Sequence, residues 1–198
     1  MPPVLAYHSI FGAYGFWLPN DPRGSWSKEV KADHLKRFGA PIHPGTRRSV
    51  AHRPHDVALR TQAKRQLVRT NVVFRDDQIE CLDRGFHELV KKTRLIVYAA
   101  AIMPDHVHLV YPRDRCDAEQ FVGMFKRAGS RALRDAGLHP FADAAPKQDR
   151  VPTPWAENAW HVFLHDEEEL RSRIQYVLNN PIKAGRPAQS WPFVTPFA

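Results

Sequence analysis

Apolar and polar residues follow two different periods along this chain, one typical of helices and the other of strands. Three segments carry apolar side chains three or four positions apart and predict amphipathic helices, at 77–92, 117–138 and 166–180. Four shorter segments are rich in aliphatic or aromatic residues and predict strands, at 4–11, 95–103, 106–111 and 160–164. The predicted order is therefore strand, helix, strand, strand, helix, strand, helix.

That order matches a ferredoxin-like βαββαβ core followed by one more helix. We predict an α+β fold with a four-stranded antiparallel sheet, two core helices packed on one face, and an appended C-terminal helix. Residues 1–198 are expected to form a single domain, in which residues 20–70 are a basic insertion of loops and short helix. A basic helix is expected at 57–68 within that insertion.

Each of the three long helices is expected to begin at an aspartate that is followed three positions later by Glu or Gln. Such pairs predict capping boxes, here at Asp77–Glu80, Asp117–Gln120 and Asp166–Glu169. Pro181 is expected to end the last helix, because proline cannot continue the hydrogen-bond ladder. The buried stripe of this helix is predicted to be Leu170, Ile174, Val177 and Leu178.

The positive charge of the chain is concentrated in one region. The net charge is +8, and residues 28–69 contain eleven Lys and Arg against three acidic residues, a surplus of eight. Outside this region the basic and acidic residues are equal in number. The local surplus therefore indicates a polyanionic partner such as DNA. The residues predicted to contact phosphates are Lys28, Lys31, Arg47, Arg48, Arg53, Arg60, Lys64, Arg65 and, on the helix at 117–138, Lys126, Arg127 and Arg131.

Three aromatic residues in or near the basic region have two possible fates. Trp17, Trp26 and Phe38 could stack on unpaired bases of a single strand, or they could pack in a core. The two cysteines, Cys81 and Cys116, predict neither a disulfide framework nor a zinc site. No apolar run approaches the length of a membrane span, so we expect a cytoplasmic protein with no membrane partner.

The candidate chemistry begins at His106-Val107-His108, directly after a predicted turn. Side chains two apart on a strand point to the same face, so both imidazoles could bind one metal ion. Two histidines alone make an incomplete metal site, and two solvent-facing imidazoles are the alternative interpretation. Tyr176 and Asn180 are four residues apart on the last predicted helix, on one flank away from its apolar stripe, and Asn180 could supply a third ligand.

Such a site would suit attack on a phosphodiester. Two neutral imidazoles and a neutral amide leave the charge of a divalent ion available to a phosphoryl oxygen. The mixed ligands suit Mg²⁺ or Mn²⁺ beside an anionic substrate, with Zn²⁺ as an alternative. The phenol of Tyr176 could act as nucleophile and form a covalent phosphotyrosine, which keeps the phosphodiester energy for rejoining.

Two blocks of the chain resemble signatures of one family. Residues 103–109, Met-Pro-Asp-His-Val-His-Leu, resemble the Met-Pro-Asn-His-Val-His-Leu signature of the single-tyrosine transposases of insertion sequences, especially the REP-associated tyrosine transposases of the HUH superfamily. Residues 176–185 resemble their Tyr-x-x-x-Asn-Pro-Val-x-Ala-Gly block. Asp105 replaces the usual Asn, residues 20–70 are longer than the minimal family core, and the whole resemblance covers roughly residues 95–186.

The resemblance implies a ferredoxin-like core, usually a homodimer, that cleaves and rejoins single-stranded DNA with hairpin-bearing ends. It implies that His106, His108 and Asn180 bind the metal ion, and that Tyr176 attacks the scissile phosphate to give a 5′-phosphotyrosine and a free 3′-OH. Three alternatives remain open at this stage. They are a replication initiator or relaxase, a non-catalytic or domesticated nucleic-acid binder, and a metallohydrolase that would need further His or Asp ligands.

Overall fold

The computed structural model describes residues 3–16, 18–19, 21, 33–39, 54–144 and 151–198. Outside these residues lie five of the predicted phosphate-binding residues, Lys28, Lys31, Arg47, Arg48 and Arg53, and two aromatic residues whose role the sequence left open, Trp17 and Trp26. The described elements are β1 (Ala6–Ala13), α1 (Asp33–Lys36), α2 (Val57–Arg65), α3 (Asp76–Thr93), β2 (Ala99–Ile102), β3 (His106–Pro112), α4 (Ala118–Asp135), β4 (Trp155–Leu164) and α5 (Glu167–Lys183).

The four strands form one antiparallel sheet in the order β2-β3-β1-β4. With α3 between β1 and β2, and α4 between β3 and β4, this is the ferredoxin-like arrangement that the sequence predicts. The two central strands, β1 and β3, pair so that Ile10 lies opposite His108. β4 begins at Trp155, five residues earlier than predicted, because the buried Trp155 ring packs against Phe11 and Phe74.

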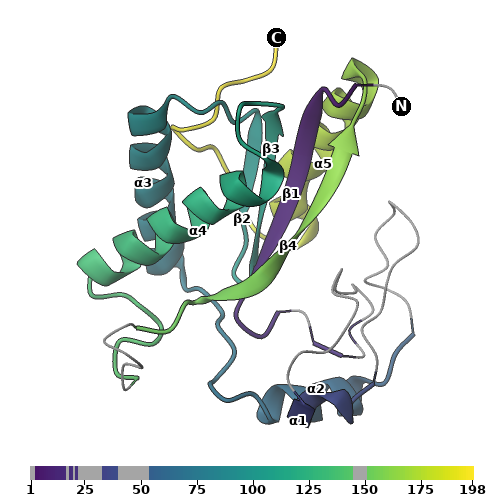
Figure 1. Cartoon of the computed structure of the whole chain (residues 1–198), viewed down its shortest axis with the longest axis vertical. Coiled ribbons are helices and arrows are strands. Elements are labelled where there is room, and N and C mark those ends of the chain that lie inside the picture. Colours follow the sequence, from purple (N-terminus) through teal and green to yellow (C-terminus); the bar gives the residue numbers. More distant parts are fainter. Residues whose placement is uncertain (1–2, 17, 20, 22–32, 40–53, 145–150) are drawn as a thin grey trace.

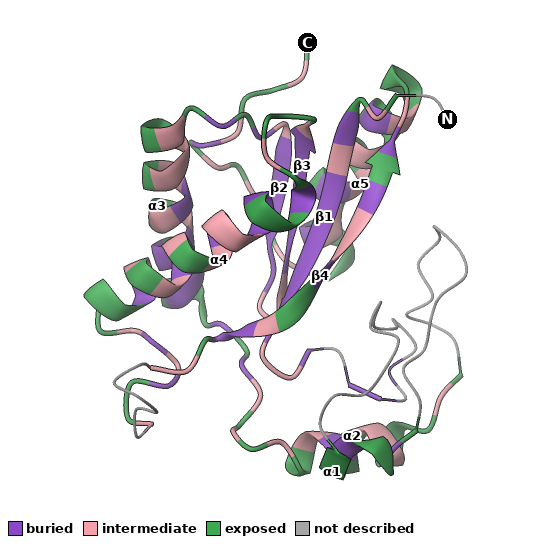
Figure 2. Ribbon diagram, in the orientation of Figure 1, coloured by how far each residue is buried: buried purple, intermediate pink, exposed green. Residues whose placement is uncertain are grey.

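Helices cover both faces of the sheet (Figure 1). The α3 and α4 pair packs on one face over Phe11, Leu109 and Trp155, as expected for the two core helices. The appended helix α5 covers the opposite face, where Leu170 and Val177 pack on the small side chains of β2 and on Val110. The two central strands therefore lie between two helical layers (Figure 2), and most of their side chains are buried.

One of the three predicted capping boxes, at α4, is observed in full, the one at α5 is observed only as its N-cap bond, and the one at α3 begins at a different residue. At α4 the Gln120 N–H donates to Asp117 at 2.7 Å, and at α5 the Glu169 N–H donates to Asp166 at 2.8 Å. At α3 the Arg75 N–H donates to the Gln78 amide at 2.9 Å, so the cap lies two residues before the predicted Asp77–Glu80 pair. The Arg75 guanidinium instead binds the Asp77 carboxylate.

The prediction that Pro181 ends the last helix is wrong. Pro181 lies inside α5, which continues to Lys183. A proline removes only one N–H, and the last turn is closed by N–H groups of Ala184 and Arg186, which donate to the Asn180 and Pro181 carbonyls. Pro181 is buried and completes the apolar stripe in place of Leu178, which is exposed.

The basic segment contains two short helices that form a small lobe, residues 33–39 and 54–67, with its own apolar cluster. The predicted helix at 57–68 is observed as α2, and Ala63 packs with Leu18, Leu35 and Phe38. Phe38 is therefore a packing residue, and its ring is not free to stack on bases. Within the described part of the chain, no helix is long and apolar enough to cross a membrane.

Gly129→Ala is expected to lower the free energy of unfolding by about 1 kcal/mol. Ala is favoured over Gly in a helix by about 1 kcal/mol, but overpacking a core costs about 1–3 kcal/mol. A Cβ at Gly129 would lie 2.7 Å from Leu82 Cδ2 and 3.0 Å from the ring of Trp155. That ring cannot shift easily, because its N–H donates to the Lys126 carbonyl.

The matched control is Gly123→Ala on the same helix. Its Cβ would meet only the end of the flexible Arg127 side chain, at 3.2 Å, so a stabilisation of up to about 1 kcal/mol is expected. Urea unfolding of both variants measures the difference. Equal stabilisation by the two substitutions would show that the contact between α3 and α4 is looser than the structure indicates.

Candidate active site

The two histidines of the predicted pair point to the same face of the sheet and converge. The Nε2 atoms of His106 and His108 lie 2.9 Å apart, and both rings are on the face that α5 covers. His108 is 2% exposed, whereas His106 lies at the edge of the covered region. The alternative of two solvent-facing imidazoles is therefore wrong, because only His106 reaches solvent.

Each imidazole has a partner at its other nitrogen. The Nδ1 atom of His106 lies 2.7 Å from Asp105 Oδ1, and the Nδ1 atom of His108 lies 2.9 Å from Nε2 of His8. If both Nδ1–H groups donate to these partners, the two Nε2 lone pairs face each other. Two facing lone pairs repel unless a proton or a cation lies between them, and such outer partners are typical of metal-binding histidines.

The spacing of the two Nε2 atoms fits a metal ion. Imidazole nitrogens lie about 2.1 Å from a bound divalent ion, so two of them at right angles are about 3.0 Å apart. The observed 2.9 Å agrees with that value. Within the described residues no group of three or more His, Cys, Asp or Glu side chains is arranged to hold a metal ion. A complete site would therefore need a ligand of another kind.

Burial keeps two of these imidazoles neutral. It is the main cause that holds the pKa of both His8 and His108 well below the ordinary value, and positive charge at Arg173 and His106 lowers the two values further. A neutral imidazole is the form that binds a metal ion. His8 is fully surrounded, and its Nδ1 atom has no hydrogen-bond partner among the described groups.

Tyr176 lies beside this cluster. Its ring centroid is 5.9 Å from that of His108 and 6.0 Å from that of His8. Two cations lie over the same ring, with Arg173 Cζ at 5.3 Å and Lys183 Nζ at 5.8 Å from its centroid. The helix flank predicted from sequence is therefore turned toward the histidines, and two cations lie beside it.

Asn180 lies one turn beyond Tyr176 on α5 and is half-buried. Residues four apart on a helix share a flank, so Asn180 lies on the same flank of α5 as Tyr176. An amide oxygen is a suitable ligand for Mg²⁺ or Mn²⁺.

His8, Phe16, Arg173 and Lys183 belong to this site but are not among the site residues predicted from the sequence. His8 approaches His108 because β1 pairs with β3 in one particular register, which a single sequence does not reveal. Phe16 stacks on the His106 ring at 4.8 Å between centroids. Arg173 could have been found, because it precedes Tyr176 by three positions and therefore shares its helix flank.

The structure separates the predicted phosphate-binding residues into groups. Arg60, Lys64 and Arg65 lie on α2, where Arg60 also pairs with Asp21 at 3.9 Å. Arg127 and Arg131 are exposed on α4, which covers the opposite face of the sheet from Tyr176. They are therefore not brought to the histidine cluster.

The prediction that Lys126 contacts DNA is corrected by its hydrogen bonds. Its ammonium donates to the carbonyls of Ala156 at 2.8 Å, Glu157 at 3.0 Å and Asn158 at 3.3 Å. All three donors are used, and burial lowers the pKa of Lys126 to about 8. Lys126 therefore holds β4 against α4, and its charge is not available to a phosphate.

The buried imidazoles predict that the metal-free protein loses stability in mild acid. The pKa of His8 and of His108 is lowered on folding, so below about pH 6.5 the unfolded chain binds protons that the folded chain does not. The contribution of these two imidazoles to the free energy of unfolding is therefore fully present above that pH. It decreases as the pH falls, by at most about 1.4 kcal/mol per pH unit for each imidazole.

Urea unfolding between pH 7.5 and 5.5, with EDTA present, measures this dependence. His8→Phe is the comparison, because it removes one titrating group from the same position. Its stability should fall less steeply with acid than that of the unchanged chain. An identical slope in the two proteins would mean that His8 takes up its proton in the folded state.

Comparison with known proteins assigns the family. Residues 57–179 match the family model described as transposase, IS200 like, a segment that contains His106, His108 and Tyr176. A solved REP-associated tyrosine transposase bound to a REP hairpin is 11% identical, with 98% of this chain and 76% of that chain covered and a TM-score of 0.45. A protein of Deinococcus radiodurans R1 assigned as a transposase is 14% identical, with 95% of each chain covered and a TM-score of 0.39.

No curated protein matches the chain in sequence. The two structural likenesses are distant, and the assignment rests on the sequence match, which spans more than half of the chain and joins α2 to most of α5. This chain belongs to the family of IS200-like transposases.

Proposed function

We propose that this protein cleaves and rejoins single-stranded DNA through a covalent bond to Tyr176, with Mg²⁺ or Mn²⁺ as cofactor. The observation that carries the proposal is the position of the Tyr176 ring, within about 6 Å of two imidazoles that burial keeps neutral. A phenol, a pair of metal-binding nitrogens and two cations are the groups that phosphodiester attack by tyrosine needs.

His106 and His108 would hold the metal ion, with Asn180 as third ligand. The ion supplies positive charge to the scissile phosphate, which stabilises the transition state. Asp105 and His8 act as positioning residues, since they accept the Nδ1–H groups and leave both Nε2 lone pairs free for the ion.

The chemical step is a transesterification. The Tyr176 oxygen forms a bond to phosphorus as the bond from phosphorus to O3′ breaks, and the departing O3′ takes up a proton. The products are a 5′-phosphotyrosine and a free 3′-OH, and the reverse attack by a 3′-OH rejoins the strand. Arg173 and Lys183, which lie over the Tyr176 ring, place positive charge beside the reacting groups.

The substrate would be single-stranded DNA with hairpin ends, bound by a homodimer in the cytoplasm, where the DNA is. Arg60, Lys64 and Arg65 of α2 and the basic sequence before it would bind the phosphates. A non-catalytic nucleic-acid binder could share this basic surface. DNA binding alone does not require a tyrosine beside neutral histidines. The position of Tyr176 therefore supports a DNA-cleaving enzyme over a non-catalytic binder.

The test is adduct formation. The protein is incubated with end-labelled single-stranded DNA that carries a hairpin, with Mg²⁺, with Mn²⁺ or with EDTA, and is analysed on a denaturing gel. We expect a labelled protein–DNA band that needs the metal ion. DNA binding with no such band under any metal condition would support the non-catalytic binder instead.

A further inference from the structure

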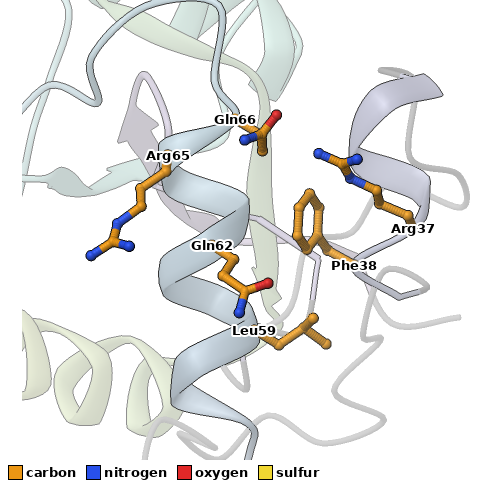
Figure 3. Close-up of a pocket in the computed structure, with 6 residues that line it drawn as sticks. All are labelled: Arg37, Phe38, Leu59, Gln62, Arg65 and Gln66. Carbon is orange, nitrogen blue, oxygen red and sulfur yellow. The ribbon is translucent and has the colours of Figure 1, made fainter.

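A pocket of about 520 Å³ lies in the basic lobe, outside the site described above. It is lined by Arg37 and Phe38, which follow α1, and by four residues on or next to the lobe's longer helix, Leu59, Gln62, Arg65 and Gln66 (Figure 3). This volume is within the range of small-molecule and cofactor sites. Among the six described lining residues there is no carboxylate, and Arg37 and Arg65 carry positive charge.

One wall of the pocket is flat and cationic. The guanidinium of Arg37 lies over the Phe38 ring, with Cζ 4.9 Å from the ring centroid. Phe38 is buried in the lobe's core and fixes this arrangement from below, whereas Arg37 is exposed. Within the described part of the chain, no acidic side chain pairs with Arg37. Planar guanidinium groups are surfaces on which nucleic-acid bases stack.

The facing wall offers hydrogen bonds. Gln62 and Gln66 are four residues apart on α2, so they share one flank, and both are exposed. Each amide has donors and an acceptor, and the edge of a base presents the complementary groups. Arg65 also lines the pocket, and its side chain extends from the other flank of α2, away from Arg37 (Figure 3).

We propose that this pocket binds one unpaired nucleotide of the DNA strand. The base stacks on Arg37, the amides of Gln62 and Gln66 bind its edge, and Arg65 binds the adjacent phosphate. The inference rests on the proposed function for the identity of the strand. The pocket itself needs only a nucleotide, because a flat cation opposite paired amides matches a planar ring with a polar edge.

The lobe is joined to the histidine cluster. The loop that leaves β1 places Phe16 on the His106 ring, and two residues later Leu18 enters the apolar cluster of the lobe. Asp21, further along the same loop, pairs with Arg60 of α2. A strand held in the pocket is thereby held at a set position relative to Tyr176, so the pocket would select which phosphate is cut.

The test uses a neutral double variant of the full chain, Gln62→Ala with Gln66→Ala, which removes both amides and no charge. Binding to a fluorescent single-stranded oligonucleotide is measured by anisotropy, and a second oligonucleotide carries abasic positions throughout. We expect the double variant to bind the normal strand about tenfold more weakly and the abasic strand equally well. Arg113→Gln, an exposed arginine at the end of β3, is the control for charge, and circular dichroism checks the fold.

Each outcome decides the proposal. Equal loss on both strands, or no loss on either, would overturn it, because the amides would then not contact a base. The proposed function is judged separately by the covalent band. If the covalent band forms but the double variant binds both strands like the unchanged protein, only the proposal of a nucleotide pocket is overturned. If the double variant loses affinity for the normal strand alone but no band forms at any metal concentration, only the proposed cleavage chemistry is overturned.

Discussion

Tyr176→Phe is expected to abolish the covalent protein–DNA band, with a loss of at least about 1,000-fold in the rate of its formation. The substitution removes one oxygen and leaves the ring beside His8 and His108, so the fold and the DNA affinity should be nearly unchanged. The rate is measured on denaturing gels under single-turnover conditions, with saturating Mn²⁺ and labelled single-stranded DNA.

Tyr98→Phe is the matched control. Tyr98 also lies on the α5 side of the sheet, where its ring packs on Phe197. Among the described residues, no ring contact joins Tyr98 to the histidine cluster. The Tyr98→Phe variant should form the covalent protein–DNA band at the same rate as the unchanged protein. A band that survives Tyr176→Phe would identify another nucleophile and would remove the basis of the proposed mechanism.

His106→Ala is expected to reduce Mn²⁺ affinity and covalent band formation together, each by at least about 100-fold. The substitution removes one of two nitrogens whose 2.9 Å separation fits a shared ion, and a single remaining imidazole is a weak site. His106 is the better choice than His108 for this test, because His108 is buried and its loss would also leave a cavity. Mn²⁺ binding is followed by electron paramagnetic resonance.

His87→Ala provides the comparison for the loss of one imidazole. His87 lies on α3, which covers the other face of the sheet, so it should leave Mn²⁺ binding and the band unchanged. If His106→Ala bound Mn²⁺ as tightly as the unchanged protein, the paired nitrogens would not be the metal site. Loss of the band with unchanged Mn²⁺ affinity would assign His106 a role in proton transfer instead.

Local patterns in the sequence were sufficient to predict the order of elements and the two halves of the candidate site. Alternation in β3 put His106 and His108 on one face, and helical periodicity put Tyr176 on a flank away from the core. These features depend only on residues close together along the chain. The order βαββαβ then limited the sheet to few arrangements, of which the observed one is the ferredoxin-like arrangement.

Features that depend on strand register or on contacts between distant elements were not predictable. His8 joins the site through a contact across 100 positions, and nothing near it in the chain signals that contact. Lys126 looks like a surface cation, yet its ammonium is used by three carbonyls of β4. A charged side chain can be assigned to a ligand only after the polar groups that it satisfies within the fold are known.

The direct measurement of the central claim is mass spectrometry of the trypsin-digested adduct. Cleavage after Arg173 and Lys183 releases residues 174–183, in which Tyr176 is the only side chain with a hydroxyl group, and no Cys or His is present. We predict that the nucleotide mass is found on this peptide, attached through a 5′-phosphate. The same mass on any other peptide, with residues 174–183 recovered unmodified, would contradict the account.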